Sequence, residues 1–257
     1  MIDLTTLADL TPGICSVTLR SHGIDEVVRI SANAGLAGIE WGTDVHVSDA
    51  DNATRAKEAT AAAGLGVLSL GSYYRCGEFG DFGRVLDLAT QLGAPRIRVW
   101  AGEIGSDGAT EEHWDKVVND TRRIAQLAAE RGISIAFEYH GNTLTDSPAT
   151  TVDLLGRVNH PNVGTYWQPA VGLSDRQALE ALHLVLPHVV GVHAFSWGPE
   201  AERFPLRNRK QLWQTVTDIL RGNGKDMDIM LEFVQDDLPD NVIKDAAFLH
   251  TITLGED

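Results

Sequence analysis

Short apolar runs and longer amphipathic stretches alternate eight times along the chain. The apolar runs lie at 13–18, 36–41, 65–71, 96–100, 133–139, 162–167, 188–194 and 227–233. Continuous apolar runs of this length are typical of parallel strands that are buried on both faces. The stretches between them predict helices near 24–34, 49–63, 80–92, 110–131, 148–158, 174–186, 208–221 and 238–252. The pattern therefore predicts an α/β protein made of repeated strand–helix units.

Glycines support these helix ends, because glycine readily adopts the left-handed conformation that closes a helix. Gly35, Gly64, Gly93 and Gly132 each follow a helical stretch directly. Eight units in 257 residues average about 32 residues each, which suits a (β/α)8 barrel. We therefore expect one domain over residues 1–257, although an open, doubly wound sheet has the same alternation.

Polar residues at the ends of the last four apolar runs favour the closed barrel. Glu138 follows ISIAF, Gln168 follows VGTYW, His193 follows VVGV and Glu232 follows MDIML. Residues from strands five to eight converge on one centre only if the sheet curls into a barrel. The fingerprints GxGxxG after the first strand and GxxxxGK[ST] are also absent.

Two carboxylates, a carboxamide and an imidazole are suitable ligands for one divalent metal ion. An octahedral Mg, Mn or Co site is as consistent with these donors as a Zn site. Glu138 and Glu232 would lie on opposite sides of the barrel mouth, where a carboxylate can also accept a proton. We therefore predict a metal site of Glu138, Gln168, His193 and Glu232, with the two glutamates as catalytic groups. Taken singly, His193 could be a core histidine and Gln168 a structural residue.

Further polar and aromatic residues follow the same strands and could bind a substrate. Arginine and histidine side chains can bind sugar hydroxyls, and tryptophan rings can stack against a sugar face. Each residue also has an ordinary structural explanation, such as filling the barrel or pairing with a nearby acid. The predicted substrate-binding residues are His46, Arg75, Arg98, His140, Trp100 and Trp197.

Charge and cysteine content narrow the choice of partners and compartment. The formal charge is -15 and no cluster of lysine and arginine offsets it, so we expect no nucleic-acid partner. Cys15 and Cys76 are far apart and form no CxxC motif, as expected for free thiols in a reducing compartment. No apolar run reaches about 18 residues and no basic leader is present. We therefore predict a cytoplasmic protein without a membrane partner.

The motifs resemble the xylose isomerase-like TIM barrels, the sugar phosphate isomerase/epimerase superfamily. The likeness extends over most of the chain, through GIEWGTDVHV, SLGSYYR, IRVWAG, FEYHGNTLTDS, TYWQP, VHAFSW and LEF. In that family one divalent metal is typically bound by Glu, Asp, His and Glu at the ends of strands five to eight. These positions match Glu138, Gln168, His193 and Glu232, so Gln168 replaces the usual Asp. A neutral amide predicts weaker metal binding and a stronger Lewis acid.

The resemblance implies a sugar or sugar phosphate isomerase or epimerase that acts through a cis-enediolate. One Glu would remove a proton next to a carbonyl and the other would return it, with Mn, Mg, Co or Zn as the cofactor. The His after the metal Asp and the Arg after the metal His, which are common in epimerases of the family, are not evident here. A small carbohydrate is the expected partner, and a homo-oligomer is possible.

Three other functions are compatible with the same scaffold. A dehydratase or lyase acting on a keto-sugar or keto-inositol would need an acid over the leaving group, and His140 or His46 could supply it. An abasic-site endonuclease would need more metal ligands and a basic groove, which the net charge disfavours. A non-catalytic sugar-binding barrel is the third alternative.

Overall fold

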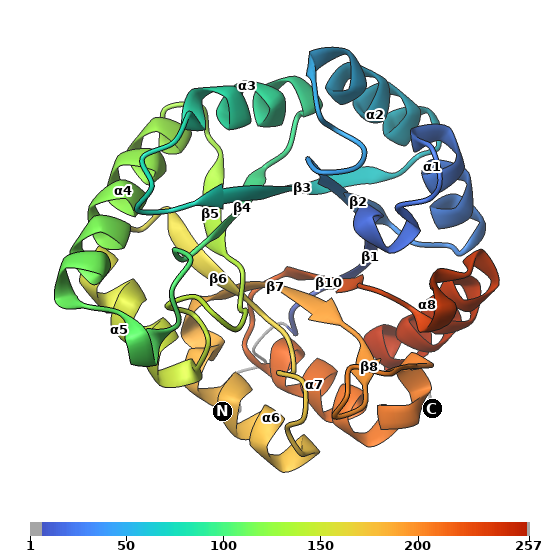
Figure 1. Cartoon of the computed structure of the whole chain (residues 1–257). Helices are drawn as coiled ribbons and strands as arrows, with labels where there is room; N and C mark the ends of the chain where they lie inside the picture. Colours follow the sequence, from blue (N-terminus) through green and yellow to red (C-terminus); the bar gives the residue numbers. More distant parts are fainter. Residues whose placement is uncertain (1–6, 256–257) are drawn as a thin grey trace, which may run out of the picture.

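A computed structural model describes residues 7–255 and shows a closed parallel barrel surrounded by helices (Figure 1). The order of the strands around the barrel is β1-β10-β7-β6-β5-β4-β3-β2. The predicted (β/α)8 TIM barrel is therefore confirmed. The barrel strands are β1 (Leu10–Cys15), β2 (Gly38–Gly42), β3 (Gly66–Arg75), β4 (Arg96–Trp100), β5 (Ser134–Phe137), β6 (Val163–Trp167), β7 (Val189–Ala194) and β10 (Met227–Leu231).

One helix follows each barrel strand and covers its outer face. Each predicted helix is present, with ends that differ by at most a few residues from the expected ones. Gly35, Gly64, Gly93 and Gly132 all have positive φ, which confirms their place at helix ends. The helices are α1 (Ile24–Asn33), α2 (Ala50–Ala62), α3 (Phe82–Leu92), α4 (Glu111–Ala129), α5 (Pro148–Val158), α6 (Asp175–Val185), α7 (Lys210–Gly222) and α8 (Pro239–Leu254).

Strand β1 differs most from its predicted range. It begins at Leu10 rather than at residue 13, and Ser16–Leu19 form a 3-10 helix instead of continuing the strand. Ser16–Leu19 are nevertheless all buried, which explains why their apolar pattern resembles a strand.

None of the helices within residues 7–255 is both long and apolar enough to cross a membrane.

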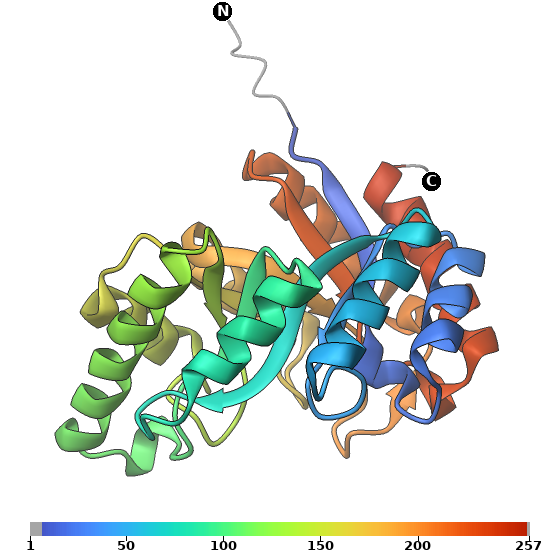
Figure 2. The same cartoon turned by 90° about the horizontal axis from the view of Figure 1, so that it is seen from above.

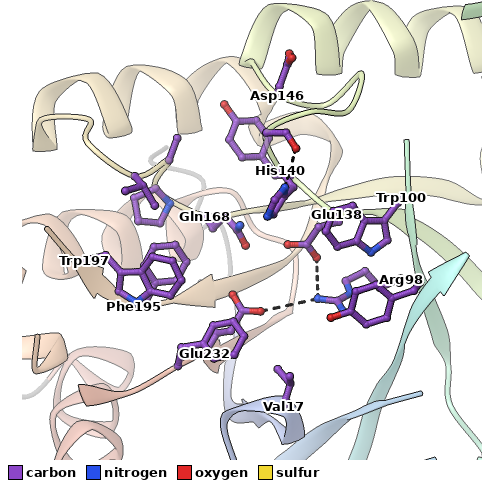
Figure 3. A pocket seen from close by; sticks show the side chains of 17 residues that line it. Val17, Arg98, Trp100, Glu138, His140, Asp146, Gln168, Phe195, Trp197 and Glu232 are labelled. Atoms are coloured by element: carbon purple, nitrogen blue, oxygen red, sulfur yellow. Dashed lines mark hydrogen bonds and ion pairs between the residues drawn. The ribbon is translucent and has the colours of Figure 1, made fainter. Parts of the chain in front are cut away.

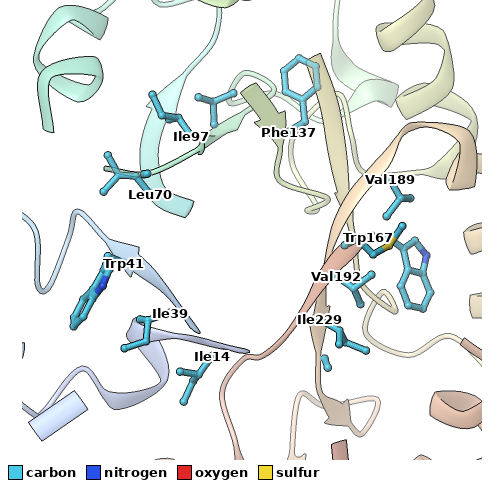
Figure 4. Packing of buried hydrophobic residues seen from close by; sticks show 14 of the residues in the cluster. Ile14, Ile39, Trp41, Leu70, Ile97, Phe137, Trp167, Val189, Val192 and Ile229 are labelled. Carbon is cyan, nitrogen blue, oxygen red and sulfur yellow. The ribbon is translucent and has the colours of Figure 1, made fainter. Parts of the chain in front are cut away.

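Side chains of the strands alternate between the helices and the barrel interior. Ile39, Ile97, Phe137 and Ile229 belong to the large apolar cluster between strands and helices (Figure 4). Their neighbours face inward, where a small cluster contains Cys15, Leu68, Ala136, Tyr166 and Met230. This alternation leaves the inward positions near the strand ends for polar residues. In the side view of Figure 2, the loops that follow the strands collect at one edge of the barrel.

The loop after β7 is held in place by a buried carboxylate on α8. Strands β8 (Ser196–Trp197) and β9 (Arg203–Phe204) form a small antiparallel pair in this loop. Asp245 accepts a hydrogen bond from the Leu206 backbone N–H at 2.9 Å. Burial raises the pKa of Asp245 to about 6. The carboxyl group therefore binds its proton more tightly in the folded protein than in the unfolded chain.

This shift predicts that Asp245 lowers stability above pH 6. Between about pH 4 and pH 6 the folded state binds more protons than the unfolded state, so stability falls as pH rises. We expect Asp245→Asn to be more stable than the parent at pH 8 by about 1–2 kcal/mol, and not at pH 4. Urea unfolding at the two pH values measures this difference. Equal differences from the parent at both pH values would contradict the prediction.

Candidate metal and active site

The inward positions near the carboxyl ends of six strands hold six buried polar side chains. Strand alternation explains their direction, because the residue before each of them belongs to the outer apolar core. Arg98, for example, lies between Ile97 and Val99, which are both fully buried in the outer core. The six residues are Glu40, Arg98, Glu138, Gln168, His193 and Glu232, and all are at most 9% exposed.

A cavity of about 460 Å³ opens over four of the inward residues (Figure 3). Arg98, Glu138, Gln168 and Glu232 form its polar floor. Its walls are largely aromatic, which is typical of pockets that bind small molecules. They contain Tyr73, Trp100, Tyr139, His140, Phe195, Trp197 and Phe233, together with Val17, Gly141, Asp146, Pro169, Ala170 and Val171.

The four predicted ligands converge around one nitrogen of His193. The Nδ1 atom lies 2.9 Å from Gln168 Oε1, 3.6 Å from Glu138 Oε1 and 3.6 Å from Glu232 Oε2. Neighbouring ligand atoms around an ion with bonds of about 2.1 Å are about 3.0–3.4 Å apart, so the two separations of 3.6 Å would shorten by a few tenths of an ångström around a small divalent cation. Without a cation the Nδ1–Gln168 contact is a hydrogen bond, and a bound ion would replace its proton.

Arg98 lies near the other oxygen of Glu138 and of Glu232. Its Nη1 atom lies 2.8 Å from Glu138 Oε2 and 3.9 Å from Glu232 Oε1, as the dashed lines in Figure 3 indicate. Each glutamate therefore presents one oxygen to the guanidinium and the other to the imidazole. Burial raises the pKa of Glu138, but Arg98 and His193 together outweigh it and the net shift is downward. The pKa of Glu232 is raised, mainly by burial.

The formal charges of this cluster also fit a divalent ion. Glu40, Glu138 and Glu232 carry three negative charges, and Arg98 carries one positive charge within 3.9 Å of all three. With His193 neutral, as a metal ligand must be, the cluster has a formal charge of minus two. In the metal-free protein burial lowers the pKa of His193, but Cys15, Glu232 and Glu138 raise it and the net shift is well upward. Buried charge is costly unless it is compensated, so a divalent cation would stabilise this arrangement.

Removal of the Arg98 charge should therefore destabilise the metal-free protein. We expect Arg98→Met to lower the free energy of unfolding by about 3–5 kcal/mol, because three carboxylates lose their compensating cation. Added Mn²⁺ should restore part of this loss. Urea unfolding with and without Mn²⁺ measures both effects, with Arg75→Met as a control that removes an arginine outside the cluster. A metal-free Arg98→Met protein as stable as the parent would contradict the charge assignment.

Glu40 was not predicted as a site residue, although it is part of the cluster. It lies at the end of the second apolar run, so the rule that identified the last four polar residues would also have identified it. Cys15, Glu40 and His193 also bring potential metal ligands within 4.8 Å of one another. This second group lies deeper in the barrel, where its members are at most 2% exposed and offer no open position for a substrate.

The structure brings some of the predicted substrate-binding residues to the cavity and not others. Arg98, Trp100, His140 and Trp197 line it. His46 lies elsewhere, with its ring nitrogens 3.0 Å from Ser16 Oγ and 2.9 Å from the His22 carbonyl oxygen. Arg75 is not a lining residue either, and its guanidinium lies over the Trp100 ring while Nη1 donates to the Gly102 carbonyl.

Several lining residues had no clear signal in the sequence. Tyr73 stacks on Trp100 with ring centroids 5.6 Å apart, and the ring centroid of Phe233 lies 5.8 Å from that of Trp197.

Both Cys15 and Cys76 are free and buried, which confirms the prediction of free thiols. Burial raises the pKa of each thiol to about 12, so neither is a ready nucleophile.

Comparison with known proteins supports the fold and gives relatives with different activities. A 3-dehydroshikimate dehydratase of Bacillus anthracis is 28% identical over 163 residues, which are 58% of this chain and 58% of the relative. The match thus spans little more than half the length of that curated relative. Both a dehydratase and epimerases are found among the proteins that this chain resembles.

Solved structures with the same fold extend over nearly the whole chain. A probable 3-DHS dehydratase of Bacillus anthracis has a TM-score of 0.74 at 18% identity, covering 95% of this chain and 99% of the other. D-psicose 3-epimerase of Clostridium cellulolyticum with D-tagatose has a TM-score of 0.74 at 13% identity, with coverages of 95% and 99%. A Mycobacterium smegmatis protein in complex with magnesium has a TM-score of 0.69 at 14% identity, with coverages of 96% and 98%. At these identities the likeness shows the fold alone.

The family described as xylose isomerase-like TIM barrel matches residues 28–252. This range contains all the residues of the predicted metal site. The chain therefore belongs to the xylose isomerase-like TIM barrel family.

Proposed function

We propose that this protein is a divalent-metal-dependent dehydratase that removes water from a cyclic hydroxy-ketone. The proposal rests on the contacts that Glu138 and Glu232 make with Arg98 and His193. One oxygen of each glutamate faces Arg98 and the other faces His193 Nδ1. Glu138 has one oxygen 2.8 Å from Arg98 and would bind the metal ion through the other, so it is a poor base. An epimerase that transfers protons through Glu138 and Glu232 would need a free oxygen on each.

His140 is better placed than the glutamates to transfer a proton. Its ring lies in the cavity beside Trp100, with centroids 4.7 Å apart (Figure 3). Its Nδ1 atom lies 2.7 Å from the Gly141 carbonyl oxygen, which can only accept a hydrogen bond. This contact places the ring hydrogen on Nδ1 and leaves the Nε2 lone pair free to act as a base.

A single imidazole is sufficient for removal of water. A divalent ion bound by Glu138, Gln168, His193 and Glu232 would acidify the C–H bond next to a ketone by withdrawing charge from the ketone oxygen. His140 Nε2 takes that proton, and the electron pair moves to the ketone oxygen, on which Arg98 can stabilise negative charge. When the pair returns, the C–O bond of the β-hydroxyl breaks. His140 then gives its proton to the departing oxygen, which leaves as water, so the imidazole ends unchanged.

The aromatic walls suit a ring-shaped substrate, and the dehydratase relative suggests which ring to test first. We infer that 3-dehydroshikimate, named in that relative, is the first candidate. Loss of water from it leaves a conjugated ring with new absorption in the near ultraviolet. The experiment is incubation of the Mn²⁺-loaded protein with this compound, followed by absorbance and mass spectrometry.

The expected result is a product lighter by one water, formed only in the presence of the metal. The contrasting result is no loss of water together with deuterium uptake from heavy water into a ketohexose such as D-tagatose. That outcome would contradict the dehydratase proposal and would support the isomerase or epimerase prediction.

A further inference from the structure

Glu40 is a buried carboxylate that the proposed reaction does not use. It lies on β2, on the side of the barrel opposite β6, and is 2% exposed. Its Oε2 atom accepts hydrogen bonds from Ser69 Oγ at 2.6 Å and Tyr166 Oη at 2.8 Å. Its Oε1 atom lies 3.5 Å from Arg98 Nη1 and 3.6 Å from His193 Nε2. Glu40 therefore has one fully engaged oxygen and one that faces the imidazole.

The two nitrogens of His193 face different groups. Nδ1 faces the oxygens of Gln168, Glu138 and Glu232. Nε2 is buried and has no hydrogen-bond partner among the described residues. His193 itself is 0% exposed, so bulk water is not available to Nε2. The carboxylate within ion-pair distance of this nitrogen is Glu40.

Metal binding through Nδ1 fixes where the remaining ring hydrogen must be. A neutral imidazole that donates the Nδ1 lone pair to a cation carries its hydrogen on Nε2. A buried N–H without an acceptor is costly, and metal-binding histidines usually donate this hydrogen to a carboxylate, a carbonyl or water. Glu40 Oε1 is the negatively charged acceptor at this position, and a shift of about half an ångström would bring it to hydrogen-bond distance.

We propose that Glu40 is a positioning residue that accepts the Nε2–H of His193 and holds Nδ1 towards the metal ligands. This inference rests on the metal site of the proposed function. The interior of the barrel fixes Glu40 in turn, because Tyr166 Oη accepts a hydrogen bond from Arg96 Nε at 3.0 Å while it donates to Glu40. Arg96 is also paired with Asp228 on β10. A chain of contacts thus extends from β10 through β4 and β6 to the metal-binding imidazole.

The affinity for Mn²⁺ in two variants separates positioning from charge. Glu40→Gln and Glu40→Leu both remove the negative charge, but only glutamine retains an oxygen that can accept the hydrogen. We expect Glu40→Gln to bind Mn²⁺ about tenfold more weakly than the parent, and Glu40→Leu about 100-fold more weakly. Equal affinities of the two variants, or a parent-like affinity of Glu40→Leu, would overturn the positioning role. Thermal unfolding of both variants verifies that they are folded.

A control variant tests the other group next to Nε2. The Cys15 thiol lies within 4.8 Å of ligand atoms of His193 and Glu40 and could act as a weak acceptor. Cys15→Ala should keep the affinity for Mn²⁺ within about threefold of the parent, since removing a group that is not needed changes little. A loss in Cys15→Ala as large as that in Glu40→Leu would assign the role to the thiol and overturn the role of Glu40.

The imidazole can also be observed directly in the parent protein, which avoids any question of variant folding. Two-bond ¹H–¹⁵N spectra of the Zn²⁺-loaded protein distinguish a ring hydrogen on Nε2 from one on Nδ1. We expect Nε2 to carry the hydrogen and Nδ1 to be metal-bound, and the reverse assignment would overturn the inference. A parent that binds no divalent metal would overturn both this inference and the proposed function. A parent that binds metal but dehydrates no cyclic hydroxy-ketone would overturn only the latter.

Discussion

Glu232→Gln is expected to remove the bound metal and to lower the rate of dehydration at least about 10³-fold. Glu232 is 6% exposed and directs Oε2 at His193 Nδ1, 3.6 Å away, while its backbone N–H donates to the Ala194 carbonyl. Glutamine keeps the size of the side chain but removes one of the three negative charges. A divalent ion would then leave the cluster with an excess positive charge, which is costly in a buried site.

Elemental analysis after incubation with Mn²⁺ and desalting measures the first effect, and kcat measures the second. Asp146→Asn is the matched control, because Asp146 lines the same cavity but its oxygens accept hydrogen bonds from Ser106. It should retain about one metal per chain, as the parent should. A Glu232→Gln protein that retains the parent's metal content would show that Glu232 is not a ligand.

His140→Asn is expected to lower kcat about 10²–10⁴-fold while metal binding is unchanged, as for loss of a general acid–base group. His140 is exposed, and the hydrogen bond that its ring makes is to its neighbour Gly141. Asparagine can donate that hydrogen bond but does not accept and return a proton near neutral pH. The two variants therefore differ in kind, since Glu232→Gln loses metal and turnover and His140→Asn loses turnover alone.

Turnover and Mn²⁺ affinity of His140→Asn test this directly. The comparison variant is His46→Asn, because His46 was the other candidate acid but lies against Ser16 and the His22 carbonyl. It should leave kcat within about threefold of the parent, since the His46 ring contacts Ser16, His22 and Trp41, and none of these three lines the cavity. If His140→Asn retained the parent's kcat, proton transfer would have to be assigned to another group.

Strand periodicity and the polar residues at strand ends were sufficient to predict the barrel and the convergence of four polar side chains at one end of it. An inward residue after a buried strand has little freedom, so Glu138, Gln168, His193 and Glu232 converge as their positions indicate. Glu40 on β2 follows the same rule, although the prediction covered only the last four strands. Strand ends were thus predictable because sheet geometry determines where their side chains point.

The predicted substrate-binding residues were harder to place, because strand periodicity does not determine loop turns, register shifts or pairs between distant strands. His46 lies beyond the end of β2, in a turn that packs it against Trp41 and away from the cavity. Arg75 ends a ten-residue strand whose pairing with β4 shifts register between Gly71 and Arg75. Arg98 was predicted to bind substrate, but its pairing with three carboxylates depends on strands that are distant in sequence.

The most direct test of the account is anomalous diffraction at the manganese edge from crystals grown with Mn²⁺. We expect one strong peak bonded to His193 Nδ1 and to oxygens of Glu138, Gln168 and Glu232, with Glu40 next to Nε2. No peak in the cavity, or a peak among Cys15, Glu40 and the Nε2 side of His193, would contradict it.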